Sequence, residues 1–148
     1  MERFRDRTIV ITGAASGIGA ASARRFAAEG AKLVVSDIDA EGGEAVAAET
    51  GGTFVAADVT DEAQVAALLR AAVDRHGRID GLVNNAGIMG QGTLPDLDGE
   101  TWRRVIDVDL NSVFYGGRAA IPHFRSGGGG VIVNTASISG IAGDYALP

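Results

Sequence analysis

Three glycines, at positions 13, 17 and 19, separate an apolar run from an amphipathic segment near the start of the chain. The apolar run covers residues 8–11 and the amphipathic segment covers residues 20–29. Glycines at such a junction permit a tight turn, and the helix that follows presents unpaired N–H groups and a positive dipole end. In parallel α/β sheets this junction receives the pyrophosphate of a dinucleotide. The spacing here is Gly-x-x-x-Gly-x-Gly, and a purely structural role for the glycines is the alternative.

Apolar runs of strand length alternate with longer helical segments along the whole chain. Several of these runs contain Val, Ile and Leu without polar alternation, which is typical of a parallel sheet buried on both faces. Alternating strands and helices with right-handed crossovers predict an α/β, Rossmann-type, doubly wound parallel sheet in a single domain, residues 1–148. The predicted strands are residues 8–12, 32–37, 53–56, 81–84 and 131–135, and the predicted helices are residues 16–29, 40–50, 61–76 and 101–124.

Composition excludes several classes of site and partner. The chain has no cysteine, which removes disulfides and cysteine-based zinc sites, and we expect no bound metal. No apolar run approaches the roughly 20 residues that a membrane span needs. The net charge is −6 without a basic run, which argues against nucleic acid as a partner. The first residues lack the apolar core of a signal peptide, so we expect a cytoplasmic protein.

An acidic residue, Asp37, ends the second predicted strand 18 positions after Gly19. A carboxylate at that point can accept hydrogen bonds from the ribose hydroxyls of an adenosine group. The same carboxylate would repel the 2′-phosphate of NADP, and its neighbours Ala14, Ala15 and Ile38 carry no charge that would bind a phosphate. These residues predict an NAD site rather than an NADP site, with an ordinary surface turn acid as the alternative.

Two further motifs follow predicted strands. Asp58-Val59 comes after the third strand, and Asn84-Asn85-Ala86-Gly87 ends the fourth. Ligands of open α/β sheets bind at the carboxyl ends of the strands. Asparagine is a poor strand residue, so a pair of asparagines at this point indicates a role other than strand formation.

Together, the glycine loop, Asp37, Asp58-Val59 and Asn84-Asn85-Ala86-Gly87 resemble the short-chain dehydrogenase/reductase family, over residues 8–144. The resemblance implies hydride transfer between NAD(P) and a small-molecule secondary alcohol or ketone, in a homodimer or homotetramer of the full-length protein. It also implies that Asp58 meets the adenine, that Val59 lines its pocket and that Asn84 braces the sheet. The implied cofactor-binding residues are Gly13, Ala15, Ser16, Gly17, Ile18, Gly19, Asp37, Ile38, Asp58, Val59, Asn85, Ala86 and Gly87.

The same resemblance assigns two catalytic candidates. The family's catalytic serine falls on Ser137, whose hydroxyl would hydrogen-bond the substrate oxygen, while Ser139 is the weaker candidate. A serine that only caps the loop after a strand is the structural alternative. The family's helix asparagine aligns with Asp109, which when ionised can only accept hydrogen bonds. Asn111 does not substitute for it, because two residues along a helix turn the side chain to another face.

The family's general acid/base is a tyrosine followed four residues later by a lysine, and it lies a dozen or so residues beyond the serine. Counting from Ser137 passes Pro148, and Tyr145 comes only eight residues after Ser137, so we expect Tyr145 to be an active-site loop residue. We therefore expect a sheet that is incomplete at its C-terminal side, and a longer protein. Two other functions remain alternatives: a non-catalytic NAD-binding module that senses redox state, and a methyltransferase, which also has a glycine loop.

Overall fold

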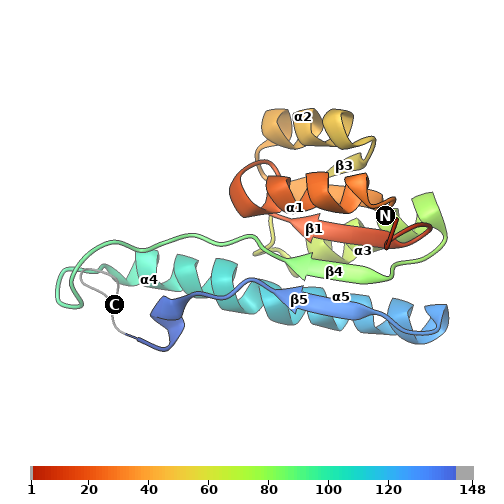
Figure 1. Ribbon diagram of the computed structural model, residues 1–148. Coiled ribbons are helices and arrows are strands. Elements are labelled where there is room, and N and C mark those ends of the chain that lie inside the picture. The colour runs from red at the N-terminus through yellow and green to blue at the C-terminus, as the bar shows by residue number, and fades with distance from the viewer. Residues whose placement is uncertain (1, 143–148) are drawn as a thin grey trace.

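The computed structural model describes residues 2–142, and a parallel sheet of five strands runs through its centre (Figure 1). The strand order is β3-β2-β1-β4-β5, so the chain builds outward from β1 in one direction and then returns to build from β1 in the other. The crevice of a doubly wound sheet lies where this order reverses, between β1 and β4. The strands are β1 (Thr8–Thr12), β2 (Lys32–Asp37), β3 (Thr53–Ala56), β4 (Gly81–Asn84) and β5 (Val131–Asn134).

Helices cover both faces of the sheet. Helices α1 and α2 pack on one face, and α3 and α5 pack together on the other (Figure 1). The helices are α1 (Gly17–Ala28), α2 (Ala40–Thr50), α3 (Glu62–His76), α4 (Gly99–Ile106) and α5 (Ser112–Gly127), with a 3-10 turn at Ile138–Gly140. The predicted fold class and the five strands are confirmed, with the last strand ending at Asn134 rather than at residue 135.

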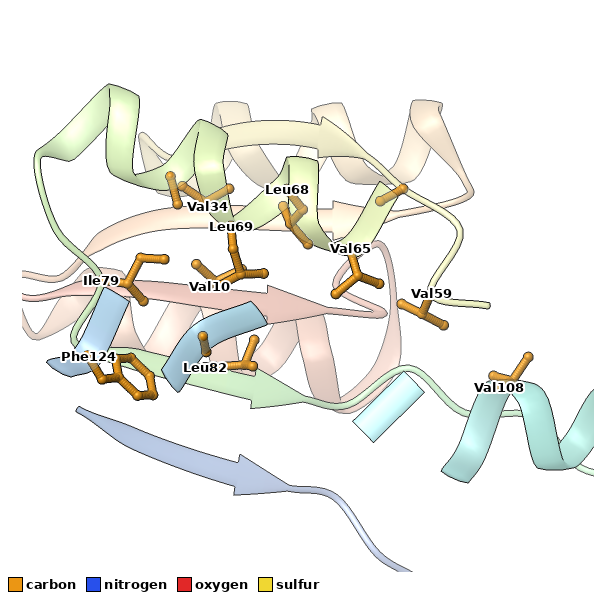
Figure 2. Packing of buried hydrophobic residues seen from close by; sticks show 13 residues of the cluster. Val10, Val34, Val59, Val65, Leu68, Leu69, Ile79, Leu82, Val108 and Phe124 are labelled. Atoms are coloured by element: carbon orange, nitrogen blue, oxygen red, sulfur yellow. The ribbon is translucent and has the colours of Figure 1, made fainter. Parts of the chain in front are cut away.

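The two cores follow from the alternation of side chains along buried strands. Val10 of β1 points into the cluster beneath α3 and α5, whereas its neighbours Ile9 and Ile11 point into the cluster beneath α1 and α2. Figure 2 shows Val10 among Leu68 and Leu69 of α3. Because both faces are buried, an apolar residue at every strand position is stabilising, which explains the absence of polar alternation in the sequence.

Helix ends are set by local side chains. The Asp61 carboxylate accepts hydrogen bonds from the backbone N–H groups of Ala63, at 2.8 Å, and Gln64, at 3.2 Å, and so caps α3. Gly77 ends this helix at a φ of 80°, a backbone conformation that favours glycine. Asp39 caps α2 in the same way, through the N–H of Gly42. The predicted limits of α2 are confirmed, and α1 and α3 each begin one residue later than predicted.

The long helix predicted over residues 101–124 is interrupted. It begins earlier, at Gly99, and a π-helical turn, Asp107–Asn111, separates α4 from α5. In this turn the N–H of Ser112 bonds to the carbonyl of Asp107, five residues back. The carbonyl of Val108, which would accept that N–H in an α-helix, instead accepts the hydroxyl of Ser112. The prediction of one regular helix was wrong here because a serine can replace a backbone donor without changing the apolar pattern.

The N-terminal segment is fixed to the end of α1. Phe4 packs edge-on against Phe26, with ring centroids 4.8 Å apart, and its N–H bonds to the carbonyl of Glu29. The Glu29 carboxylate is nearly buried, and it pairs with the guanidinium groups of Arg3 and Arg25. Hydrogen bonds from Arg3, with the charge of Arg25, outweigh desolvation and lower the pKa of Glu29 from 4.5 to about 2.

The far edge of the sheet is open in the part of the chain that the structure describes. Strand β5 pairs with β4 alone, and its Val131 and Val133 side chains are 62% and 50% exposed. No helix within residues 2–142 is both long and apolar enough to cross a membrane.

Candidate cofactor-binding site

A cleft of about 510 Å³ lies at the carboxyl ends of the strands, where the strand order reverses. It brings together segments that are up to 122 residues apart in the sequence, from Gly13 to Thr135. Eleven of the predicted cofactor-binding residues line it, and the two that do not, Ala15 and Gly19, lie directly behind the wall. The lining residues are Gly13, Ser16, Gly17, Ile18, Asp37, Ile38, Ala57, Asp58, Val59, Asn85, Ala86, Gly87, Ile88, Arg104, Val108 and Thr135.

The three loop glycines meet three different constraints. A Cβ atom on Gly13 would lie 2.7 Å from the Cα of Ala86, so the loops after β1 and β4 approach too closely for any side chain. A Cβ atom on Gly19 would lie 2.1 Å from the carbonyl oxygen of Gly13, so α1 packs directly on its own loop. Gly17 has open space around it and a φ of 53°, so it is required for its backbone conformation.

The first turn of α1 opens into the cleft. Ser16 occupies the N-cap position with extended backbone, but its hydroxyl forms no cap hydrogen bond. The first turn also contains no acidic residue, in contrast to α2 and α3. The N–H groups and the positive dipole end of α1 therefore face the cleft without a side chain of their own helix to neutralise them, which is the arrangement that binds phosphate.

Asp37 holds its predicted position beside this turn. Its carboxylate accepts hydrogen bonds from the N–H groups of Ala15, at 2.9 Å, and Asp39, at 3.0 Å. These bonds fix the carboxylate at the wall of the cleft, and each oxygen keeps lone pairs for a further donor such as a ribose hydroxyl. Ala15 therefore orients Asp37 from behind the wall.

The loop after β3 is held by its own side chains. One carboxylate oxygen of Asp58 accepts from both the N–H and the hydroxyl of Thr60, at 2.9 and 2.8 Å. The N–H of Asp58 donates to the side-chain oxygen of Gln64 on α3, at 3.0 Å. Val59 is buried beside this loop and lines the cleft. Asp58 and Val59 therefore form a fixed part of the cleft wall, one polar and one apolar.

The asparagine pair divides into two roles. The Asn84 side chain donates to the side-chain oxygen of Asn134 on β5, at 2.9 Å, which agrees with its expected part in bracing the sheet. The Asn85 side chain donates to the carbonyl groups of Thr12, at 3.1 Å, and Gly13, at 3.0 Å. The Asn85 amide therefore holds the glycine loop in place, although the residue also lines the cleft.

Thr12 is a residue of this site that the sequence analysis missed. Its hydroxyl accepts from the N–H groups of Asn85, at 3.1 Å, and Ala86, at 3.2 Å, and so joins the end of β1 to the loop after β4. A hydroxyl at the carboxyl end of β1, directly after the apolar residues 9–11, was the available signal. Thr135 was missed as well, and its hydroxyl lies 3.3 Å from the side-chain oxygen of Asn85.

Asp109 lies in the π-helical turn, outside the lining of the cleft. Its carboxylate accepts the N–H of Ile88, at 2.9 Å, and so connects the helix to the loop that follows Gly87. This contact needs only an acceptor, which an ionised aspartate supplies.

Ser137 is exposed and also lies outside the lining of the cleft. Its hydroxyl oxygen accepts the N–H of Ser139, at 3.2 Å, and so caps the 3-10 turn. This is the bond that the structural alternative for Ser137 requires. Tyr145 lies outside the described residues.

Arg104 of α4 also lines the cleft and was not predicted from the sequence. With Asp37 and Asp58 it makes up the charged lining, two carboxylates and one guanidinium. A search confined to the neighbours of Asp37 in the sequence could not have found it, because it lies 67 residues further on. In residues 2–142, no group of three or more His, Cys, Asp or Glu side chains is arranged to hold a metal ion.

A family model described as short chain dehydrogenase matches residues 7–147. The chain is 44% identical to levodione reductase of Leifsonia aquatica over 149 residues, which cover 95% of the chain and 56% of the relative. It is 47% identical to cis-4-hydroxycyclohexanecarboxylate dehydrogenase of Sinomonas cyclohexanicum over 148 residues, 96% of the chain and 59% of the relative. The chain thus spans less than two thirds of the length of these curated relatives.

Solved structures agree with these matches. A crystal structure of levodione reductase superposes with a TM-score of 0.93 at 44% identity, covering 98% of this chain and 59% of that one. A short chain dehydrogenase from Mycobacterium smegmatis superposes with a TM-score of 0.94 at 37% identity, covering 99% of this chain and 65% of that one.

Proposed function

The chain belongs to the short-chain dehydrogenase family, and on that premise we propose that its protein is an oxidoreductase that interconverts a secondary alcohol and a ketone with NAD. The observation that supports this most is the cleft, in which the open first turn of α1 and the carboxylate of Asp37 line one wall side by side. When bound, NAD supplies the group that accepts or donates the hydride.

The donor and acceptor groups of the cleft fit such a dinucleotide. The first turn of α1, at Ser16 and Gly17, offers N–H groups and a positive dipole end for the pyrophosphate. Asp37 offers a fixed carboxylate for the adenosine ribose, and Asp58 and Val59 offer a polar and an apolar wall for the adenine. Apart from the adjoining residues, no atom lies within 4 Å of the position that a Cβ atom on Gly17 would take, and this space leaves room for the phosphates.

NAD rather than NADP is the cofactor that this wall favours. The Asp37 carboxylate is held by two backbone N–H groups, so it cannot turn away from a 2′-phosphate. Its neighbour Ile38 offers no charge to offset the repulsion between the two anions. Equal or tighter binding of NADPH than of NADH in a titration would contradict this preference.

Ser137 and Asp109 are the catalytic candidates of the proposal. The Ser137 hydroxyl would donate a hydrogen bond to the substrate oxygen, while its own oxygen keeps accepting the N–H of Ser139. Asp109 would hold the loop after β4 in register with the helix through Ile88. A homodimer or homotetramer is part of the proposal, supported by the exposed Leu110 and Phe114 side chains along the α4–α5 helix.

The activity is tested by following NADH formation with a panel of secondary alcohols, and NADH consumption with the matching ketones. We expect turnover of at least one pair, and loss of most of it in the Ser137→Ala variant. If every alcohol and ketone is inert while NADH binds, the oxidoreductase proposal fails and the redox-sensing module replaces it. If neither NADH nor NADPH binds, both proposals fail.

A further inference from the structure

Arg104 lines the cleft but has no task in the proposed function. It is exposed, and its side chain forms no ion pair with any residue of the described range 2–142. The other charged lining residues, Asp37 and Asp58, already have hydrogen-bond donors of their own, from Ala15 and Thr60. The guanidinium of Arg104 is therefore available to a ligand of the cleft.

The helix places Arg104 at one end of the cleft. Arg104 and Val108 are four residues apart, so their side chains share a face of the helix. Val108 also lines the cleft and is buried in the same cluster as Val59, beside which it lies in Figure 2. Arg104 therefore lies about one turn, roughly 5.4 Å, beyond Val108 along the wall that continues from the loop after β3.

The first turn of α1, which the proposed function gives to the pyrophosphate, reaches the cleft from the other face of the sheet. Helix α1, whose first turn follows Ser16, covers the face of the sheet opposite to α3 and α5 (Figure 1). Helix α4 continues into α5 through the π-helical turn, so Arg104 reaches the cleft from the α3 side. The residue therefore shares its end of the cleft with Asp58 and Val59, which the proposed function gives to the adenine.

We propose that the Arg104 guanidinium lies against the face of the adenine ring and closes that end of the cleft. The inference rests on the proposed function, because it requires a dinucleotide in the cleft. A guanidinium is planar and weakly hydrated, and it stacks on purine and aromatic faces through dispersion and cation–π attraction. The carboxylates of Asp37 and Asp58 favour a cation in the same cleft, and a neutral base between them and Arg104 adds no repulsion.

The neighbouring Arg103 provides a matched control. Arg103 has the same charge and is also exposed, but it does not line the cleft, and its guanidinium lies over Gly99 at the start of α4. The experiment compares the wild-type protein with the Arg104→Ala and Arg103→Ala variants, after thermal unfolding has shown that all three are equally stable. Dissociation constants are measured for NADH, ADP, adenosine and reduced nicotinamide mononucleotide, which separate the base from the phosphates.

We expect Arg104→Ala to weaken NADH, ADP and adenosine by the same factor, roughly three- to fivefold, which is the range of an exposed cation–π contact. Reduced nicotinamide mononucleotide has no adenine, so it should bind Arg104→Ala as tightly as it binds the wild-type protein. Arg103→Ala should leave the dissociation constants of all four ligands unchanged. Unchanged adenosine binding in Arg104→Ala overturns the inference. Weaker binding of NADH and ADP, but not of adenosine, then assigns Arg104 to the phosphates, and unchanged binding of every ligand assigns it no part in binding.

Failure of the inference differs from failure of the proposed function. If wild-type protein binds NADH and Arg104→Ala binds adenosine equally well, only the role of Arg104 is wrong. If the wild-type protein binds none of the four ligands, both the proposed function and this inference are wrong.

Discussion

The glycines in the loop after β1 are required for different physical reasons. Gly17 needs a left-handed backbone conformation in open space, whereas Gly19 needs the absence of a side chain, since a Cβ atom there would lie 2.1 Å from a backbone oxygen. From the sequence alone, Gly17 and Gly19 could not be distinguished from each other. The separation depends on which atoms of other segments approach them, and that is a property of the folded chain.

The two glycines therefore predict different costs on substitution. Gly17→Ala should reduce the free energy of unfolding by about 1–2 kcal/mol through backbone strain. Gly19→Ala should reduce it by about 3 kcal/mol or more and weaken NADH binding, because α1 must move away from the Gly13 carbonyl. Urea unfolding and a fluorescence titration of NADH measure both effects, and an equal or smaller loss at Gly19 contradicts this account of the loop.

Asp37 carries the predicted choice between cofactors. Asp37→Asn keeps an acceptor oxygen but removes the charge, so it should lower the ratio of the NADPH to the NADH dissociation constant by about tenfold. Asp39→Asn is the control, because Asp39 is a nearby acid that caps α2 and does not line the cleft. A ratio that stays constant in Asp37→Asn, or falls equally in both variants, would show that Asp37 does not select the cofactor.

At the scale of elements, the helix between β4 and β5 departs most from what the sequence predicts. Its apolar spacing predicts a helix correctly, but the π-helical turn depends on one serine hydroxyl that replaces a backbone donor. The same turn carries Asp109, which accepts the N–H of Ile88 in the loop after β4. The alignment with an asparagine could not show this contact, because it joins the helical turn to a loop through the backbone N–H of Ile88.

The contact between Asp109 and Ile88 gives a graded prediction. Asp109→Asn supplies a carbonyl oxygen to the same N–H, so it should change the free energy of unfolding by less than about 0.5 kcal/mol. Asp109→Ala leaves the N–H without this acceptor and should cost about 0.5–1.5 kcal/mol, with a matching loss of NADH affinity as the loop after β4 loosens. Equal behaviour of the two variants in urea unfolding would mean that the hydrogen bond does not stabilise the loop.

The attachment of the N-terminal segment to α1 is predicted to depend on pH. The folded-state pKa of Glu29 is about 2 and its unfolded value is about 4.5, so the carboxylate stabilises the fold above pH 4.5. That contribution should shrink as the pH falls from about 4.5 towards 2, because the folded state then binds the proton less readily than the unfolded state.

The difference in urea midpoint between the wild-type protein and Glu29→Gln separates the stabilising contribution of the Glu29 carboxylate from those of the other carboxylates. The difference should be constant near neutral pH and should narrow below about pH 4.5. Glu49→Gln is a useful comparison, because Glu49 pairs with Arg24 on the exposed surface. A difference for Glu29→Gln that does not change with pH would contradict the role assigned to the buried carboxylate.

At the scale of the whole molecule, the order of strands and helices was predictable because both faces of the sheet are buried. Continuous apolar runs, such as the one that contains Val10 and the one that contains Val34, then identify strands. The cleft was predictable in part, because residues that follow parallel strands gather at one edge. Arg104 and Thr135 were not predictable, since they reach the cleft from α4 and from the loop after β5, whose positions depend on the packed sheet.

A crystal structure of the protein grown with NAD would show whether this cleft binds the cofactor across the point where the strand order reverses. We expect the pyrophosphate at the first turn of α1, the adenosine ribose hydroxyls within hydrogen-bond distance of the Asp37 carboxylate, and the adenine between Val59 and Arg104. Nucleotide bound elsewhere on the molecule, or an empty cleft at saturating NAD, would contradict it.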